Sequence, residues 1–134
     1  MNEIVFDTEN AKLNYSKSDS LLELIWKKNV TSEEFRRIYL SGVDFVIKNK
    51  VHYFLSDIRN EGLIPLDDVK WLTKEVIAKA FEIGIKKIAL VNEDDIIFSS
   101  IYADSVKKKL ENFSVKVQIF SDLSSGRSWL LTKS

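Results

Sequence analysis

An alternation of strand-like and helix-like segments from residue 21 onward most constrains what this chain can fold into. Each of four short apolar runs is followed by a segment whose apolar residues recur at helical spacing. The runs lie at residues 21–27, 51–57, 87–91 and 115–120. The helical segments are expected at about 32–49, 65–83, 98–112 and 123–131. Strands joined through helices pair in parallel with right-handed crossovers, which predicts an α/β fold with a mostly parallel sheet.

The N-terminal part of the chain has a different pattern. Residues 3–7 and 11–16 are short, partly alternating runs separated by polar breaks, which is typical of hairpin strands. The third run, 21–27, has apolar residues on both faces, with Glu23 and the final Lys27 as exceptions, so this strand is expected inside the sheet. The predicted order is β-β-β-α-β-α-β-α-β-α, in which the N-terminal strands extend one edge of a mixed sheet in antiparallel fashion.

Capping residues mark where the predicted helices begin and end. Thr31 to Glu34 reads as a capping box before the first helix. Pro65 suits the first turn of the second helix, because the N–H that proline lacks would be unpaired there anyway. Gly84 is expected to end that helix, and Asp122 to cap the last one.

The composition indicates one domain spanning residues 1–134. Hydrophobic residues make up 45% of the chain, and 20 basic side chains balance 20 acidic ones. Because this balance leaves no overall field, neither nucleic acid nor a membrane surface is expected as a partner. The absence of cysteine excludes disulfides, thiolate catalysis and cysteine-based metal sites. No apolar run is long enough for a signal peptide or a membrane span, so a cytoplasmic protein is expected.

Several segments together resemble a known group of proteins. These are the strand ending Leu24–Trp26, the helix start Ser32–Phe35, the run Tyr53–Asn60 followed by Gly62, Pro65 and Trp71, and the ending with Phe120, Asp122 and Trp129–Leu130. In these features the chain is similar to small bacterial proteins with a STAS-like fold, which is shared with the anti-sigma-factor antagonists. The resemblance covers most of the chain.

The resemblance implies a sheet flanked by helices and a role in regulation or binding. The antagonists carry an Asp-Ser-Ser-Gly-type segment, in which a serine is phosphorylated at the start of the helix after the corresponding strand. Here that segment is Ile58 to Leu63 and contains no serine. The phosphorylation switch of the family therefore does not transfer to this chain, and neither does any functional residue.

Asp57 is the first candidate for a functional residue. It ends a buried strand, and α/β sheets place their binding crevices at the carboxyl ends of such strands. The phospho-acceptor aspartate of a receiver domain is disfavoured, because two more strands follow the acidic opening strand where a receiver has a helix. The simpler interpretation is that Asp57 accepts hydrogen bonds from loop amides, so that Asp57→Ala would cost about 1 kcal/mol.

Three further residues are candidates for contacting a ligand or partner. Arg59 and Asn60 lie in the loop after Asp57, where a guanidinium and the helix start near Pro65 would form a small anion site. The alternative for Arg59 is an ion pair with Asp57 or Glu61. Trp71 falls just off the buried stripe of the second helix, which fits either an exposed partner or homodimer surface or packing beneath the 58–64 loop.

Residues suited to catalysis do not form a recognisable set. His52 is the only histidine and lies in an apolar strand, which favours a structural role. Asp94 and Asp95 follow a strand without any glycine-rich phosphate loop, so helix capping is favoured over magnesium binding. No catalytic residue, metal or cofactor is expected.

Two functional hypotheses follow from these observations. The first is a non-catalytic regulatory or interaction module that binds a protein or a small ligand near the 57–65 loop. The alternative is an enzyme or phospho-acceptor with a carboxylate site around Asp57 and Asp94. The first is favoured because the chain has no nucleophile–base pair, metal-binding cluster or cofactor loop.

Overall fold

The fold is built on one six-stranded sheet, seen here in a computed structural model. The structure describes residues 2–60, 65–76, 79, 82–92, 108 and 115–132, without the side chains of Val69 and Thr73. The strands follow one another across the sheet in chain order. Their bounds are β1 Asn2–Asp7, β2 Ala11–Ser16, β3 Leu21–Trp26, β4 Tyr53–Asp57, β5 Lys87–Val91 and β6 Lys116–Phe120.

The sheet is mixed, as the alternation of elements predicts. β1, β2 and β3 pair in antiparallel fashion, whereas β3, β4, β5 and β6 pair in parallel. β3 therefore lies inside the sheet and forms its switch from antiparallel to parallel pairing. The helices between β3 and β4 and between β4 and β5 lie on one face of the sheet, as right-handed crossovers require, and the helix that follows β6 lies on the other face.

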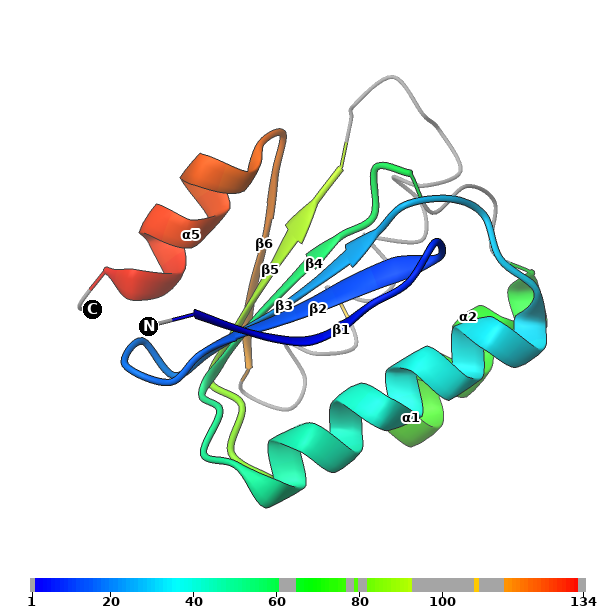
Figure 1. The fold of residues 1–134 in the computed structure, drawn as a ribbon, viewed down its shortest axis with the longest axis horizontal. Coiled ribbons are helices and arrows are strands. Elements are labelled where there is room, and N and C mark those ends of the chain that lie inside the picture. Colours follow the sequence, from blue (N-terminus) through cyan, green and yellow to red (C-terminus); the bar gives the residue numbers. More distant parts are fainter. Residues whose placement is uncertain are drawn as a thin grey trace.

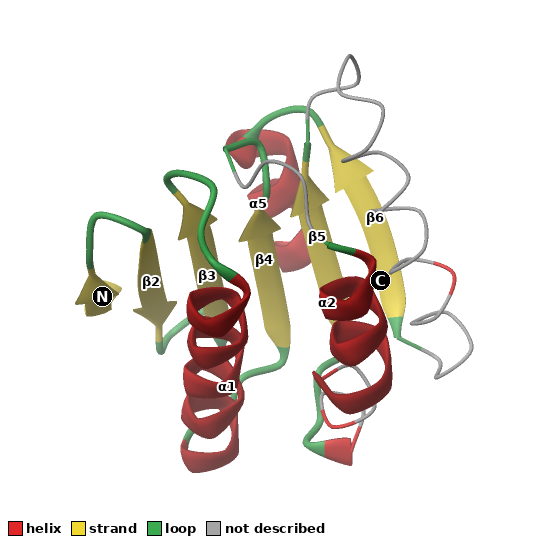
Figure 2. Ribbon diagram, turned by 90° about the vertical axis from the view of Figure 1, so that its right-hand side faces the viewer, coloured by secondary structure: helices red, strands yellow, loops and turns green. Residues whose placement is uncertain are grey.

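The helices form two layers around the sheet. Helices α1 (Ser32–Lys48) and α2 (Leu66–Trp71) lie side by side on one face, and α5 (Leu123–Leu131) covers the other (Figures 1 and 2). A π-helical turn, η1 (Leu72–Val76), continues α2. Thr31 caps α1 by accepting from the Glu34 N–H at 3.2 Å, as predicted. Gly84 has a φ of +99°, which suits the predicted helix end.

The core on the α1–α2 face is large and aromatic. Trp26 of β3 stacks on Phe35 with ring centroids 5.7 Å apart, and Phe35 meets Tyr39 edge-on at 4.9 Å. All three side chains are buried. The helical spacing of apolar residues expected over about 32–49 is confirmed in α1, whose buried side chains include Phe35, Ile38 and Val46. Among the described residues, most of the buried hydrophobic side chains belong to this core, and their burial favours folding.

The core beneath α5 is smaller, and α5 is capped at both of its ends, at the C-terminus by a side chain of the sheet. Its N-cap Asp122 accepts from the Ser125 N–H at 2.8 Å. At its C-terminus the buried Lys87 ammonium donates to the carbonyls of Trp129 (3.3 Å) and Thr132 (2.9 Å). A cation at the carbonyl end of a helix is favourable, because it binds carbonyls that have no partner within the helix.

The expected element order is confirmed where the structure describes the chain. The second helix expected over 65–83 is observed over residues 66–76, as α2 followed by the π-helical turn, which widens the helix locally; residues 77, 78, 80 and 81 lie outside the described residues. The helix expected at about 98–112, with Asp94 and Asp95 before it, lies outside the described residues apart from residue 108. No helix among the residues that are described is long and apolar enough to cross a membrane.

Candidate functional site

Asp57 and Arg59 form a tight pair at the carboxyl end of β4. Asp57 is 1% exposed. One of its oxygens, Oδ1, accepts from Arg59 Nε at 2.9 Å and from the Arg59 backbone N–H at 3.2 Å, and the other, Oδ2, accepts from Arg59 Nη2 at 2.7 Å. The Arg59 side chain is 30% exposed. Asp57 therefore makes both of the expected interactions: it accepts from a loop amide, and it forms an ion pair with Arg59. Together these hold the carboxylate more firmly than a single hydrogen bond would.

A second ion pair lies on the same face of the sheet. Glu23 of β3 is buried and accepts from Arg127 of α5, at 2.5 Å from Nε and 2.9 Å from Nη2. The hydrogen bond that Arg127 donates to Glu23 raises the pKa of Arg127, and the Asp57 charge raises it further. This pair was not predicted, although Glu23 is the only charged residue in the apolar strand β3.

Asp122 completes a row of alternating charges. Hydrogen bonds from Ser125 lower the pKa of the Asp122 carboxyl, and the nearby Arg59 charge lowers it further. Glu23 and Arg127 form one ion pair and Asp57 and Arg59 form another, while the charge of Asp57 acts on Arg127 and that of Arg59 acts on Asp122. We call these five residues the charge row. Because they come from β3, β4 and α5 and from the residues that border them, the row joins the helix to the carboxyl ends of the parallel strands.

The other two predicted contact residues lie apart from each other. Asn60 is exposed and directly follows Arg59, so it remains beside the charge row. Trp71 lies in α2 on the opposite layer, where its ring meets Phe35 edge-on at 6.4 Å and the Arg36 guanidinium lies 5.2 Å from its centre. The structure therefore places Trp71 in the contact between α1 and α2 and does not bring it together with Asp57.

Asp68 explains how this helix contact is oriented. Its buried carboxylate accepts from Ser32 Oγ at 2.6 Å and from Arg36 Nε at 2.9 Å, both of α1. Arg36 is thereby held over the Trp71 ring. From the sequence, Asp68 is expected only to interact favourably with the helix dipole, whereas the structure shows it linking the two helices.

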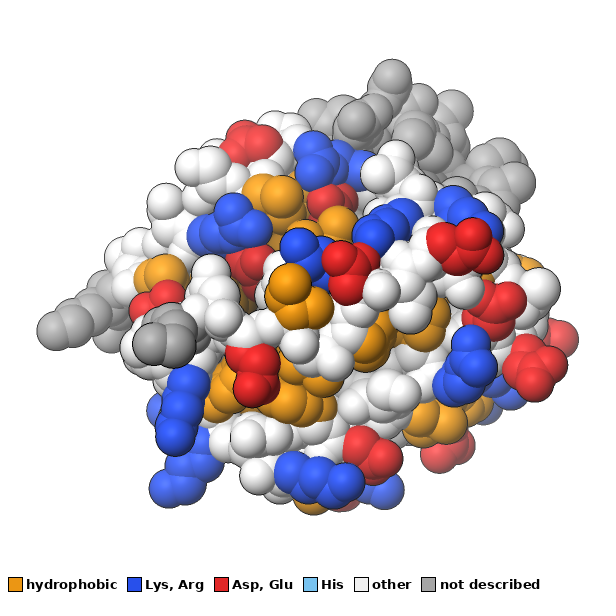
Figure 3. All heavy atoms as spheres, in the orientation of Figure 1, with side chains coloured by type: hydrophobic (Ala, Val, Ile, Leu, Met, Phe, Trp, Pro, Cys, Tyr) orange, Lys and Arg blue, Asp and Glu red, His pale blue; other side chains and the backbone are white. Residues whose placement is uncertain are grey.

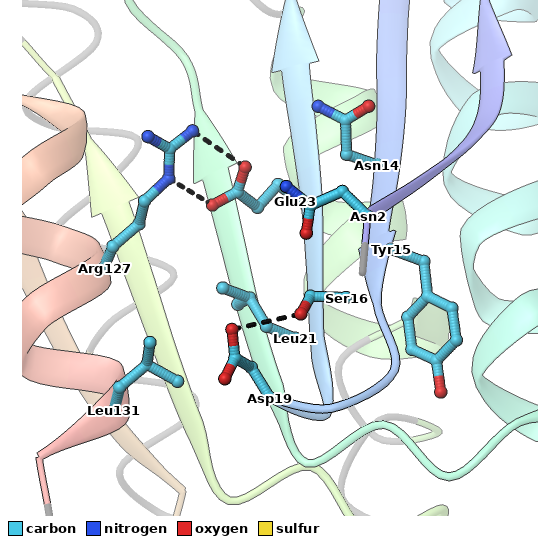
Figure 4. A pocket seen from close by; sticks show the side chains of 9 residues that line it. All are labelled: Asn2, Asn14, Tyr15, Ser16, Asp19, Leu21, Glu23, Arg127 and Leu131. Carbon is cyan, nitrogen blue, oxygen red and sulfur yellow. Dashed lines mark hydrogen bonds and ion pairs between the residues drawn. The ribbon is translucent and has the colours of Figure 1, made fainter.

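A cavity of about 250 Å³ lies beside the charge row, between α5 and the β2–β3 hairpin (Figure 4). Its wall includes Asn14, Ser16 and Asp19 of the β2–β3 hairpin, together with Glu23 and Arg127 (Figure 4). Ser16 donates to Asp19 at 3.0 Å. Neither Asp57 nor Arg59 lines this cavity, whereas Arg127, whose pKa the Asp57 charge raises, does.

His52 lies away from the charge row. The His52 ring is half-buried, and its Nδ1 lies 3.3 Å from Ser20 Oγ at the start of β3, at the end of the sheet opposite Asp57.

Within the described residues, no three acidic or histidine side chains come together as metal ligands. On the face shown in Figure 3, acidic and basic side chains are interspersed.

Comparisons with known proteins identify the fold. No family model and no curated protein matches the chain. Among solved structures it is similar to an uncharacterized protein from the DUF3478 family with a SpoIIAA-like fold, from Shewanella loihica PV-4. The two share 17% identity and a TM-score of 0.54 over 97% of this chain and 95% of the other. The chain therefore has a SpoIIAA-like, that is STAS-like, fold.

Proposed function

We propose that this chain is a non-catalytic regulatory or interaction module of the cytoplasm, which binds a protein or a small ligand near the 57–65 loop. The observation that carries the proposal is the Asp57–Arg59 pair. A buried carboxylate holds a partly exposed guanidinium at the carboxyl ends of the parallel strands, where α/β sheets bind their ligands. Because Asp57 fixes the direction of the guanidinium, little side-chain entropy is lost when a partner contacts it.

The chemistry of Arg59 indicates which group it would bind. A guanidinium attracts carboxylates and phosphates by its positive charge. Asp57 already accepts from Nε and Nη2, so an acidic group of a partner would approach the exposed part of the Arg59 side chain, beside the exposed Asn60. We therefore expect the partner to place an acidic group next to Arg59. The cysteine-free composition is compatible with a reducing compartment.

The alternative of an enzyme or phospho-acceptor around Asp57 and Asp94 receives less support. A phospho-acceptor carboxylate needs an oxygen that is open to the incoming phosphoryl group. Both Asp57 oxygens accept from Arg59, and the residue is almost completely buried. Asp94 lies outside the described residues.

Affinity capture tests the proposal. The wild-type chain, Arg59→Gln and the matched control Lys28→Gln are used as bait, and captured proteins and co-purified small molecules are identified by mass spectrometry. Lys28 is an exposed cation outside the charge row, and it pairs with Glu9. A binder retained by the wild type and the Lys28 variant but lost with Arg59→Gln supports the proposal. Equal retention by all three folded proteins contradicts it.

A further inference from the structure

The outer face of α1 carries a stripe of exposed residues that the fold itself does not use. The stripe contains two large apolar side chains, Leu40 and Ile47, each 53% exposed. Spacings of three and four residues keep its members within about a third of the helix circumference. The exposed members are Glu33, Arg37, Leu40, Ser41, Asp44, Ile47 and Lys48.

The charges of the stripe are arranged so that they complement a second, antiparallel copy of the same helix. Along the stripe the order is acid, base, acid, base: Glu33, Arg37, Asp44 and Lys48. A two-fold axis between positions 40 and 41 opposes Arg37 with Asp44 of the second copy. The same axis opposes Glu33 with Lys48, and each pair occurs twice. A surface of this kind is self-complementary, as a two-fold interface requires.

The apolar side chains fit the same arrangement. Leu40 lies next to the axis, so the two copies of this side chain meet at the centre of the contact. Ile47 of the second copy arrives near the N-terminus of α1. That end lies beside α2, since Ser32 donates to Asp68 at 2.6 Å, and the neighbouring Leu66 is 68% exposed. The contact would therefore cover three of the large apolar side chains that are now in water.

We propose that α1 is a homodimer interface, in which the stripe packs against its own copy in antiparallel orientation. Within one helix, Glu33 and Arg37 are also four residues apart, as are Asp44 and Lys48, and such pairs stabilise a solvated helix. That explanation accounts for the charges but not for Leu40 and Ile47 among them. A contact centred on one 17-residue helix is small, so we expect a dimer dissociation constant on the order of 100 µM.

Sedimentation equilibrium between about 10 µM and 1 mM tests the proposal, with circular dichroism to confirm folding. The wild type should dimerise over this range, and high salt should weaken the dimer. Arg37→Asp should weaken it at least tenfold, because two attractive pairs become repulsive. The double variant Arg37→Asp with Asp44→Arg should restore it. Leu40→Asp should abolish it, and Leu131→Asp, an exposed leucine of α5, is the matched control.

The double variant separates the interface from a role within the helix. Inside one helix, the swap places an aspartate four residues after Glu33 and an arginine four residues before Lys48, which adds like-charge pairs and predicts no rescue. If Arg37→Asp does not fold, Asp44→Arg serves as the single variant with the same expectation. A monomeric wild type at 1 mM, an unaffected single variant, or a double variant that stays monomeric would each overturn the proposal.

Discussion

The two faces of the sheet are stabilised in different ways. The face beneath α1 and α2 is filled by aromatic rings, with Trp26 and Phe35 stacked and Tyr39 edge-on to Phe35. The face beneath α5 has a small core in which Leu55 and Leu130 are fully buried. Around that small core lie the ion pairs of the charge row.

This difference indicates which face carries stability and which carries orientation. Burying apolar area is favourable in any geometry that excludes water, whereas a desolvated ion pair is favourable only when both partners are held in place. The aromatic face can therefore supply most of the folding free energy. The α5 face uses its charges to fix α5 and Arg59 relative to the strands, and positioned charges are what a binding site needs.

The largest expected effect tests whether the aromatic face dominates stability. Phe35 is 1% exposed and contacts Trp26, Tyr39 and Trp71 through its ring. Phe35→Ala should lower the free energy of unfolding by about 4 kcal/mol, because it removes a buried ring and leaves a cavity. Urea unfolding followed by tryptophan fluorescence measures this loss.

Leu130→Ala on the α5 face is the matched comparison for Phe35→Ala. Leu130 is fully buried, but it belongs to the smaller core, so its loss should be about 2–3 kcal/mol. If Leu130→Ala proves more destabilising than Phe35→Ala, the proposed division between the two faces is wrong.

The second-largest effect tests whether the buried charge of Asp57 makes its pairing with Arg59 important for stability. Arg59→Ala leaves the Asp57 carboxylate buried without its guanidinium, and we expect a loss of about 3 kcal/mol. Asp57→Ala should cost less, about 2 kcal/mol, because the remaining guanidinium is partly exposed and can be hydrated. Both losses exceed the roughly 1 kcal/mol expected of a lone loop hydrogen bond.

A double-mutant cycle shows whether Asp57 and Arg59 act as a pair. The double variant Asp57→Ala with Arg59→Ala should be more stable than Arg59→Ala alone, since it also removes the unpaired carboxylate. The measurement is urea unfolding at pH 7. Additive losses from the two single variants would mean that the pair contributes no coupling.

Much of the fold could be predicted because its signals are local. Apolar periodicity and caps placed β2 and α5 at their observed bounds, and the long spacing of parallel strands required helical crossovers. The π-helical turn after Trp71 was not predicted, since periodicity alone does not distinguish a locally widened helix from a regular one.

The charge row could be predicted only where its residues are close in sequence. Asp57 and Arg59 are two residues apart, and their pairing was one of two alternatives considered for Arg59. Glu23 and Arg127 are 104 residues apart, so nothing local in the sequence indicates that they meet. Trp71 lay near the edge of a buried stripe, and the tertiary contact with Phe35 and Arg36 decided its environment.

The smallest effects come from one glycine in a helix on each face. Gly126 of α5 lies against the sheet, where an added Cβ would come within 3.3 Å of Leu55 Cδ1 and 3.6 Å of Ala89 Cβ. Gly126→Ala should cost about 1 kcal/mol, because overpacking outweighs the better helix propensity of alanine. Gly42 of α1 has open space where its Cβ would be.

Gly42→Ala should therefore raise stability by about 0.5–1 kcal/mol through helix propensity alone. Opposite signs for these two substitutions in urea unfolding would show that α5 packs closely on its sheet face, whereas α1 leaves room at this position. A stabilising Gly126→Ala would mean that Leu55 moves aside easily. The α5 face would then be held mainly by its ion pairs, and the charge row would carry a larger share of the folding free energy than the apolar contacts beneath α5.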